Sequence, residues 1–285
     1  MKKELQFLVI APSGNGSNIY SSHWLKEPGE RIFDVCLLHY HEDIVDSERP
    51  KKVDYFYHLK DYKYPMIHKL LTDIHVELLH KYDYFFLIDD DIEICTREIN
   101  QAFLTTAALN LQLAQPSLTK DSFCSWPFLK SKRGSFVRFV GEVEVMAPIF
   151  SKDTLNKCLH TFIENKSSWG MDTLWSYILN FPKDKIAVFD FIQMKHINPV
   201  GHGELYLKLK NKHRDEWKAI QTNYGLERHY FREYGRLENV NKHRHPFIFL
   251  GIKFGESFNY LLQAIRDFGF EARIKSRLKK IIKGV

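Results

Sequence analysis

The sequence has few cysteines and no pair of them at the spacing of a metal site. The four cysteines, Cys36, Cys95, Cys124 and Cys158, lie far apart and form no CxxC motif. This spacing argues against a disulfide framework and against a structural zinc site built on cysteine pairs. We therefore expect reduced, buried thiols, as in a cytoplasmic protein.

Long apolar runs are also absent. No segment reaches the roughly 18 to 20 apolar residues that a membrane-spanning helix needs. The first residues, MKKELQFLVIAPSG, carry two lysines and a short apolar run that Glu4 and Gln6 interrupt, which favours a first β-strand over a signal peptide. We expect a cytoplasmic protein that is soluble or, at most, peripheral at the inner face of the membrane.

Several catalytic and nucleotide-binding motifs are missing. There is no GxSxG and no cysteine with the local signature of a nucleophile, so the usual hydrolase mechanisms are not supported. The segment SGNGSN, residues 13–18, lacks the Lys-Ser/Thr of a P-loop and the spacing of a dinucleotide fingerprint. Its glycines can still let Ser13 and Asn15 approach a nucleotide closely.

An excess of positive over negative charge is nearly absent outside the end of the chain. The formal net charge is +6, and from Arg266 onward seven Lys or Arg face only Asp267 and Glu271, a balance of +5. A nucleic-acid-binding protein would carry a basic surface across the fold, so we predict no nucleic-acid partner. In the tail, apolar residues lie on one helical face opposite the basic ones, which suits either a membrane surface through residues 271–285 or packing on the domain.

What the chain does have is enough apolar sequence for a sizeable core. It has 285 residues, of which 44% are hydrophobic, enough for one large domain or a domain with an appendage. Short apolar runs at 6–12, 33–41 and 53–59 predict strands, apolar spacing over 64–82 predicts a helix, and 82–89 reads as a buried strand. This alternation predicts an α/β fold with a mostly parallel central sheet flanked by helices.

The second half continues with less regular elements. The pattern predicts a helix over 97–113, a connection from Ala114 (AQPSL), a mobile loop over 121–135 and a long strand over 136–151. Further along we expect a helix from Asp153 to Phe162, a turn and helix over 167–181, a strand over 185–201, and charged, helical sequence over 204–245. The catalytic domain would span residues 1–245 and the basic amphipathic helical tail residues 246–285.

The most informative stretch is YFFLIDDDIEI, residues 84–94, where a buried strand runs into three aspartates. Ligands of open α/β sheets bind at the carboxyl ends of the strands. Asp89 and Asp91, one residue apart at such an end, can both reach a Mg²⁺ or Mn²⁺ ion, with a diphosphate completing its shell. The alternative is a solvated turn or the acidic first turn of a helix.

A second motif, SSWGMD, places Trp169, Gly170 and Asp172 at a turn before a helix. Asp172 can act there as a general base toward an acceptor hydroxyl, beside an aromatic wall suited to a sugar ring. Alternatively, Asp172 only caps the helix.

Two further segments offer polar groups. MKHINPVGH contains His196 and His202, either of which can complete a metal shell, and Lys195, which can contact a phosphate; the alternative is that these are surface or packing residues. In VGEVEVMAP, Glu142 and Glu144 fall on one face of the predicted strand. Glu144 can hydrogen-bond acceptor hydroxyls, or the pair can simply face solvent.

Taken together, these motifs resemble a known group of enzymes. A strand-end DxD, a WGxD turn and a late histidine resemble glycosyltransferases of the GT-A fold. YDYFFLIDDDIEI, AQPSL, GEVEVMAPIFS, WGMD and FDFIQMKHINPVG resemble more closely a plant and bacterial family catalogued as a domain of unknown function with glycosyltransferase-like features. The resemblance covers roughly residues 5 to 202.

The resemblance implies a GT-A-like (Rossmann-like) fold and a metal-dependent transfer of a sugar from a nucleotide-sugar donor. In that interpretation Asp91 is the principal metal ligand, Asp89 assists at the metal or the ribose, His196 completes the shell and Asp172 is the base of an inverting reaction. The acceptor would be a glycan or a lipid-linked molecule, as in bacterial surface polysaccharide synthesis. The alternatives are a non-catalytic nucleotide-sugar or carbohydrate-binding protein and a nucleotidyltransferase.

Overall fold

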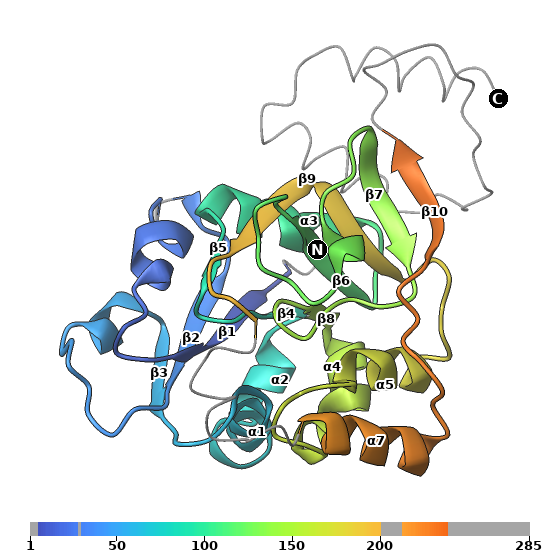
Figure 1. Cartoon of the computed structure of the whole chain (residues 1–285). Coiled ribbons are helices and arrows are strands. Elements are labelled where there is room, and N and C mark those ends of the chain that lie inside the picture. The colour runs from blue at the N-terminus through green and yellow to red at the C-terminus, as the bar shows by residue number, and fades with distance from the viewer. Residues whose placement is uncertain (1–4, 28–29, 201–212, 239–285) are drawn as a thin grey trace, which may run out of the picture.

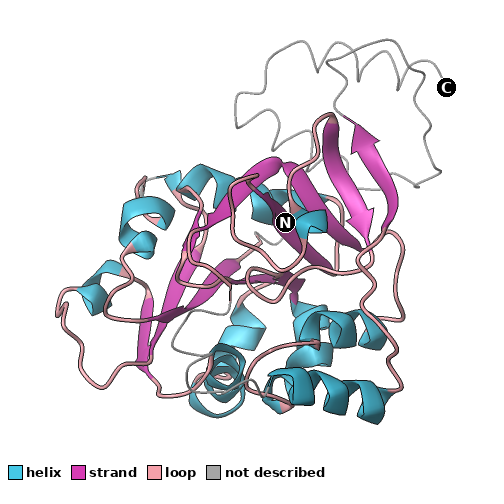
Figure 2. Cartoon of the chain, in the orientation of Figure 1, coloured by secondary structure: helices cyan, strands magenta, loops and turns pink. Residues whose placement is uncertain are grey.

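One large sheet with helices on both faces forms the centre of the computed structural model, which describes residues 5–27, 30–200 and 213–238 (Figure 1). Colouring by secondary structure shows the helices lying in two groups on opposite sides of the strands (Figure 2). The predicted α/β class, with a central sheet flanked by helices, is confirmed. No helix in these ranges has the length and apolar character needed to cross a bilayer.

Nine strands lie in the order β10-β7-β9-β6-β8-β4-β1-β2-β3, and the short β5 (Ile92–Glu93) pairs with β9. Their bounds are β1 Phe7–Ser13, β2 Asp34–His39, β3 Tyr55–His58, β4 Tyr84–Leu87, β6 Leu113–Leu118, β7 Ser135–Val140, β8 Ile149–Ser151, β9 Ile186–His196 and β10 Glu233–Glu238. The pairings leave β7 and β8 running opposite to the other strands of this path. The sheet is therefore mostly parallel, as predicted, and most of its strands end at one edge.

Burial explains why the central strands form where they do. All seven residues of β1 are buried, as expected for a parallel strand covered on both faces. Helix α3 (Thr96–Ala108) covers one face with an apolar stripe that includes Ile99, Ala102 and Phe103, and the Phe103 ring stacks on Phe7 with centroids 4.9 Å apart.

The other face carries most of the remaining helices. In Figure 1 these are α1 (Lys63–Lys69), α2 (Glu77–Lys81), α4 (Lys152–Cys158), α5 (Met171–Ile178) and α7 (His213–Tyr224). Trp175 of α5 is fully buried beside Phe150 of β8 and Phe162, with its ring centroid 5.0 Å and 5.9 Å from theirs.

Two predicted elements are interrupted in the structure. The helix expected over 64–82 breaks at His75, whose ring hydrogen-bonds the Tyr57 hydroxyl of β3, so that α1 continues as a π-helical turn, Leu70–Ile74, and α2 starts afresh at Glu77. The strand expected over 136–151 is two strands, β7 and β8. The first of them ends at Val140, and in the next residue, Gly141, a Cβ atom would come within 2.1 Å of the Tyr230 carbonyl oxygen.

Other predicted elements also differ. AQPSL is not a connection but most of strand β6, whose register shift between Pro116 and Ser117 accommodates the proline. The helix over 153–162 begins at Lys152 after an N-cap at Ser151, and it ends at Cys158 before a 3-10 turn. Within the charged region, residues 233–238 are not helical but form the edge strand β10, whose charged side chains suit an unpaired edge.

The four cysteines form no disulfide, and Cys36 and Cys158 are buried as predicted, whereas Cys95 and Cys124 are only half-buried. The basic tail over 246–285 and His202 lie outside the described residues.

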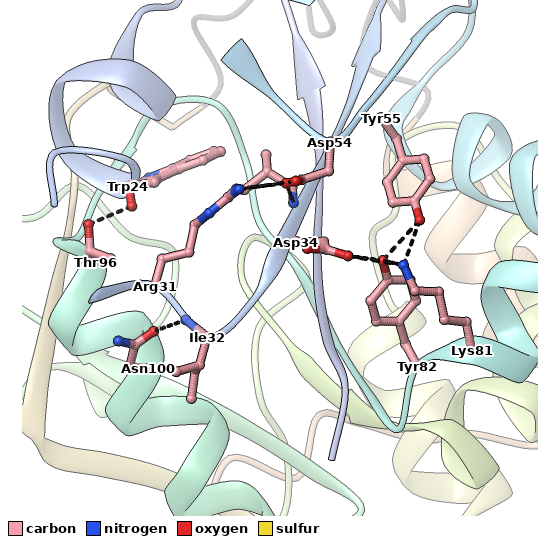
Figure 3. Close-up of polar contacts among 11 residues, drawn as sticks. Trp24, Arg31, Ile32, Asp34, Asp54, Tyr55, Lys81, Tyr82, Thr96 and Asn100 are labelled. Carbon is pink, nitrogen blue, oxygen red and sulfur yellow. Dashed lines mark hydrogen bonds and ion pairs between the residues drawn. The ribbon is translucent and has the colours of Figure 1, made fainter. Parts of the chain in front are cut away.

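Polar contacts close the sheet at the edge where β2 and β3 begin (Figure 3). Asp34 accepts hydrogen bonds from the Tyr82 hydroxyl and from Lys81, and Lys81 also reaches the Tyr55 hydroxyl at 2.9 Å. Nearby, Arg31 forms a two-pronged ion pair with Asp54, at 2.6 Å and 3.0 Å. Through these contacts the polar side chains of this edge bind one another. None of these residues lines the cavity described below.

A buried ion pair fixes the segment that leads from β6 to β7. The Arg138 guanidinium of β7 donates to both carboxylate oxygens of Asp190 on β9, at 2.8 Å and 3.0 Å, and neither side chain is exposed. Arg138 also donates to the carbonyls of Phe128 and Lys130, at 2.9 Å and 3.2 Å. The segment predicted to be a mobile loop is therefore tied to the core.

Removing one partner of this pair is expected to be strongly destabilising. Asp190→Ala leaves a buried guanidinium charge without its counter-ion, which should lower the free energy of unfolding by about 3–5 kcal/mol. The double variant Arg138→Met/Asp190→Leu, which removes both charges, should lose less. Urea unfolding followed by circular dichroism measures both, and Asp184→Asn, at an exposed position, is the control. A loss below 1 kcal/mol for Asp190→Ala would contradict this expectation.

Candidate active site

A cavity of about 820 Å³ opens at the carboxyl edge of the parallel strands. Side chains that follow β1, β2, β4 and β9 line it, together with the start of α1, the segment before β8 and the turn before α5. The lining residues that the argument uses are Lys63, Asp89, Asp90, Asp91, Trp126, Glu144, Trp169, Gly170, Asp172, His196 and His229. Seven residues that were predicted to act together, Asp89, Asp91, Glu144, Trp169, Gly170, Asp172 and His196, thus face one space.

Each of the three adjacent aspartates has a different partner. Asp89 pairs with Lys63 of α1, whose Nζ lies 2.7 Å from Asp89 Oδ1. Lys63 Nζ also donates to the carbonyls of Val145 and Met146, at 2.9 Å and 3.0 Å. Burial lowers the pKa of Lys63 while Asp89 opposes the shift; burial also raises the pKa of Asp89, against the effect of Lys63.

Asp90 holds the glycine-containing loop after β1. Its Oδ2 accepts the Gly14 N–H at 3.0 Å, and its carbonyl accepts the Ser17 hydroxyl at 2.7 Å. Burial raises the pKa of Asp90 to about 7, and the neighbouring aspartates add to the shift. From the other side the buried Arg49 donates to Ser13 Oγ and to the Gly14 carbonyl, so the loop is fixed at both ends.

Asp91 faces His196 across the start of the short β5–β9 ladder. Asp91 Oδ2 lies 3.1 Å from His196 Nε2 and accepts a hydrogen bond from Asn198 at 3.1 Å. Burial raises the pKa of Asp91, but its contacts with His196 hold it below the ordinary value. Burial lowers the pKa of His196, but the hydrogen bond and charge of Asp91 raise it to about 9.

This pair fits a divalent cation. Asp91 Oδ1 is buried and has no hydrogen-bond partner in the described part of the chain. The His196 Nδ1 lies 2.8 Å from the Phe123 carbonyl, which orients the ring so that Nε2 faces Asp91. The pair shares the Nε2 proton, and a divalent cation would displace that proton to use Nε2 as a ligand atom. An unsatisfied carboxylate oxygen beside an oriented imidazole is a suitable pair of ligands for Mn²⁺ or Mg²⁺.

The turn before α5 aims Asp172 into the cavity. Asn165 closes the turn by accepting the Ser168 N–H at 2.8 Å and donating to the Trp169 carbonyl at 2.9 Å. Gly170 is the N-cap residue, with a φ of 84°, and a Cβ atom there would lie 2.0 Å from the Trp217 ring of α7. Asp172 is therefore in the first turn and not at the cap; its Oδ1 accepts the N–H of Thr173 at 2.9 Å.

A buried cluster surrounds Asp172. His229 Nδ1 lies 3.7 Å from Asp172 Oδ1, 3.5 Å from Glu142 Oε2 and 2.7 Å from the Thr173 hydroxyl. Glu142, Asp172 and His229 offer potential ligand atoms that all lie within 4.8 Å of one another. Burial and the charge of Glu142 raise the pKa of Asp172 to about 7, and His229 opposes that shift.

Glu142 and Glu144 are not on a strand, because β7 ends before them, and neither faces solvent. Glu144 lines the cavity, its backbone N–H donates to Gln115 at 2.6 Å, and its Oε2 has no hydrogen-bond partner among the described residues. Burial raises the pKa of Glu144 to about 8, and the charge of Asp172 adds to the shift. This upward shift favours the protonated form, which can donate a hydrogen bond.

Three predicted substrate-binding residues are turned to other partners. The Ser13 hydroxyl accepts from Arg49, Asn15 donates to the Asp43 carbonyl at 2.8 Å, and Lys195 pairs with Asp121 at 2.6 Å. None of the three is among the residues that line the cavity.

Several lining residues were not singled out from the sequence. Lys63 is at the start of a helix that was predicted from its apolar residues alone. Trp126 belongs to the aromatic loop that was predicted to be mobile. His229, from the segment after α7, is one of 14 histidines. No local motif marks it, because its partners Glu142 and Asp172 are 87 and 57 positions away in the sequence.

Comparisons with known proteins give structural similarity only. No protein-family description and no curated protein matches the sequence. Among solved structures, S. aureus TarS 1-349 is 14% identical over 77% of this chain and 72% of that chain, with a TM-score of 0.46. The same fragment in complex with UDP-GlcNAc is 12% identical over 74% and 66%, with a TM-score of 0.45, and A197 from STIV is 12% identical over 68% and 86%, with a TM-score of 0.39.

Proposed function

We propose that this protein is a GT-A-like glycosyltransferase that moves a sugar from a nucleotide-sugar donor to a hydroxyl group of an acceptor. The observation that carries the proposal is the cavity itself. On one side lie Asp91 and His196, a pair of side chains that can bind a divalent cation, and on the other lies the buried carboxylate of Asp172. The cavity is at the edge of the sheet where ligands of α/β folds bind.

Asp172 is the general base of the reaction. Its carboxylate takes the proton of the acceptor hydroxyl while the acceptor oxygen forms its bond to the anomeric carbon. The bond from that carbon to the diphosphate oxygen breaks, and its electron pair leaves with the nucleoside diphosphate. A base on the face opposite the leaving group makes this an inverting transfer. A pKa raised to about 7 suits a group that must accept a proton near neutral pH.

The donor side of the cavity is formed by residues around the aspartates. Asp91 and His196 would hold Mn²⁺ or Mg²⁺, and a bound divalent ion supplies positive charge that stabilises the departing diphosphate. Lys63, which is paired with Asp89, lies on the same wall of the cavity. Asp90 and Arg49 keep the loop of Gly14 in place beside it.

The acceptor side has aromatic and hydroxyl side chains around Asp172. Trp126 and Trp169 are half-buried and line the cavity with Ser125, Ser167 and Ser168, a combination that suits sugar rings and their hydroxyl groups. Glu144, in its protonated form, donates to a substrate oxygen. We propose a glycan or lipid-linked acceptor, as in the synthesis of bacterial surface polysaccharide, and a cytoplasmic enzyme that works at the inner face of the membrane.

A thermal-shift panel of nucleoside diphosphates and nucleotide sugars, each with Mn²⁺ and with EDTA, tests the donor class. We expect at least one nucleotide sugar to raise the melting temperature in the presence of Mn²⁺ and much less with EDTA, because ligand binding to the native state stabilises it. Incubating that donor with an acceptor library and detecting the released diphosphate then tests transfer. No shift with any donor contradicts the proposal, and a shift without turnover indicates a binding protein.

A further inference from the structure

The cluster around Asp172 contains two groups that the transfer reaction, as derived so far, does not use. Glu142 follows β7, and His229 lies in the segment between α7 and β10. Glu142 is fully buried, and the side chain of His229 is only 18% exposed. Two buried carboxylates so close together repel each other when both are ionised, so the charge of the imidazole between them matters.

The imidazole of His229 is held rigidly. Its ring stacks on Trp217 of α7 with centroids 4.6 Å apart and planes 22° apart, and the Trp126 ring lies 4.6 Å away on the cavity side. The faces of indole rings attract a cation. Thr173 Oγ1, 2.7 Å from Nδ1, fixes the edge of the ring that faces the two carboxylates.

Glu142 is held as firmly. Its Oε1 accepts the N–H of Tyr230, the residue after His229, and its Oε2 has no hydrogen-bond partner among the described residues and points at His229 Nδ1 from 3.5 Å. The segment 229–230 is thereby tied to the loop after β7.

We propose that His229, as an imidazolium, and Glu142 are positioning residues that set the charge on Asp172. His229 keeps the buried Asp172 ionised and oriented before the acceptor binds, and Glu142 balances it so that Asp172 still accepts a proton. The inference rests on the proposed role of Asp172 as the base.

The titratable groups that face Asp172 come from several elements. They are His229, Glu142, Glu144 and the Tyr64 hydroxyl of α1. The pKa of His229 is lowered by burial but raised further by Glu142 and Asp172, so its net shift is upward, as an imidazolium between two carboxylates requires. The buried Tyr64, whose pKa is raised by burial first and by nearby carboxylates second, stays neutral.

The two groups must act on the pH profile in opposite directions. Asp172 works only when ionised, so kcat/KM is lost as the pH falls through the pKa of Asp172. In His229→Asn the positive neighbour is gone, the pKa of Asp172 rises, and the acidic limb should move up by about one pH unit. In Glu142→Gln the negative neighbour is gone, and the limb should move down by a similar amount. The glutamine oxygen can still accept the Tyr230 N–H.

The experiment measures kcat/KM from pH 5 to 9 for the wild type, His229→Asn, His229→Gln and Glu142→Gln, with His160→Asn, at an exposed histidine, as the control. Donor affinities should stay close to wild type, whereas the melting temperature of His229→Asn and His229→Gln should fall, because two buried carboxylates lose their counter-charge. Opposite shifts support the proposal; unchanged limbs, or shifts in the same direction, overturn it. Titration with Mn²⁺ should give the same stoichiometry for all variants, and loss of an ion in Glu142→Gln or His229→Asn would show that the cluster binds metal instead.

Failure of this inference can be told apart from failure of the proposed function. If Asp172→Asn is inactive while the pH limbs of the other variants do not move, Asp172 remains the base and only the role of His229 and Glu142 is lost. If Asp172→Asn retains full transfer, the assigned base itself is wrong.

Discussion

Asp172→Asn is expected to lower kcat by about 10²–10⁴-fold while the affinity for the donor stays near that of the wild type. Asparagine has almost the same shape, and its side-chain oxygen can still accept the Thr173 N–H that Asp172 now accepts at 2.9 Å. It cannot take a proton from a hydroxyl group, however. The loss corresponds to about 3–5 kcal/mol of transition-state stabilisation.

Donor affinity by calorimetry and transfer by release of the nucleoside diphosphate measure the two quantities separately. Asp153→Asn is a matched control, because Asp153 is also an acid in the first turn of a helix, α4, but is exposed and away from the cavity. Equal loss of donor binding and turnover in Asp172→Asn would indicate that the carboxylate supports the turn instead of the chemistry. Removing a buried acid should not lower the melting temperature, since neutral asparagine carries a smaller desolvation cost.

The sequence predicted the sheet well where burial alone decides the structure. The runs at 6–12, 33–41 and 82–89 became β1, β2 and β4, because a parallel strand covered on both faces must be apolar throughout. The prediction failed where a contact with a residue far away in the sequence determines the local structure. The helix breaks at His75, which hydrogen-bonds Tyr57, and β7 ends before Gly141, which packs against the Tyr230 backbone; neither partner is visible in the local pattern.

The candidate site shows the same contrast between features that local sequence predicts and features that tertiary packing determines. Asp89, Asp91 and His196 face one cavity because the carboxyl ends of β4 and β9 lie at one edge of the sheet, and the turn before α5 brings Asp172 to the same cavity. What the sequence could not provide is which partner each charge has. The Lys63 that pairs with Asp89 comes from the start of a helix, and the His229 beside Asp172 from a segment that follows the predicted motifs. Such pairings depend on tertiary packing, and no spacing rule predicts them.

The three adjacent aspartates illustrate why a run of carboxylates is ambiguous. Lys63 neutralises Asp89, and the pKa of Asp90, raised by burial to about 7, leaves it partly protonated while it holds Gly14. Of the three aspartates, only Asp91 keeps a buried oxygen without a hydrogen-bond partner among the described residues, and His196 lies beside it. The proposed metal site thus narrows from three adjacent carboxylates to one carboxylate, Asp91, and one imidazole, His196.

Asp91→Asn is therefore expected to abolish the metal dependence of donor binding. The carboxamide keeps the size of the side chain but loses the charge that a divalent ion requires, so Mn²⁺ affinity should fall by more than the roughly 10–100-fold that loss of an outer-shell partner costs. His196→Asn should weaken Mn²⁺ binding in the same direction. Electron paramagnetic resonance of free Mn²⁺ measures this affinity directly, without reference to turnover.

Asp184→Asn, at an exposed aspartate, should bind Mn²⁺ as the wild type does and so controls for the loss of one negative charge. The donor should then stabilise Asp91→Asn equally with Mn²⁺ and with EDTA, because the ion no longer links the protein to the diphosphate. If the wild type already binds the donor equally well in EDTA, the divalent ion has no part in donor binding. Lys60 and Lys63, two lysines that line the cavity, would then be the candidates to meet the charge of the diphosphate.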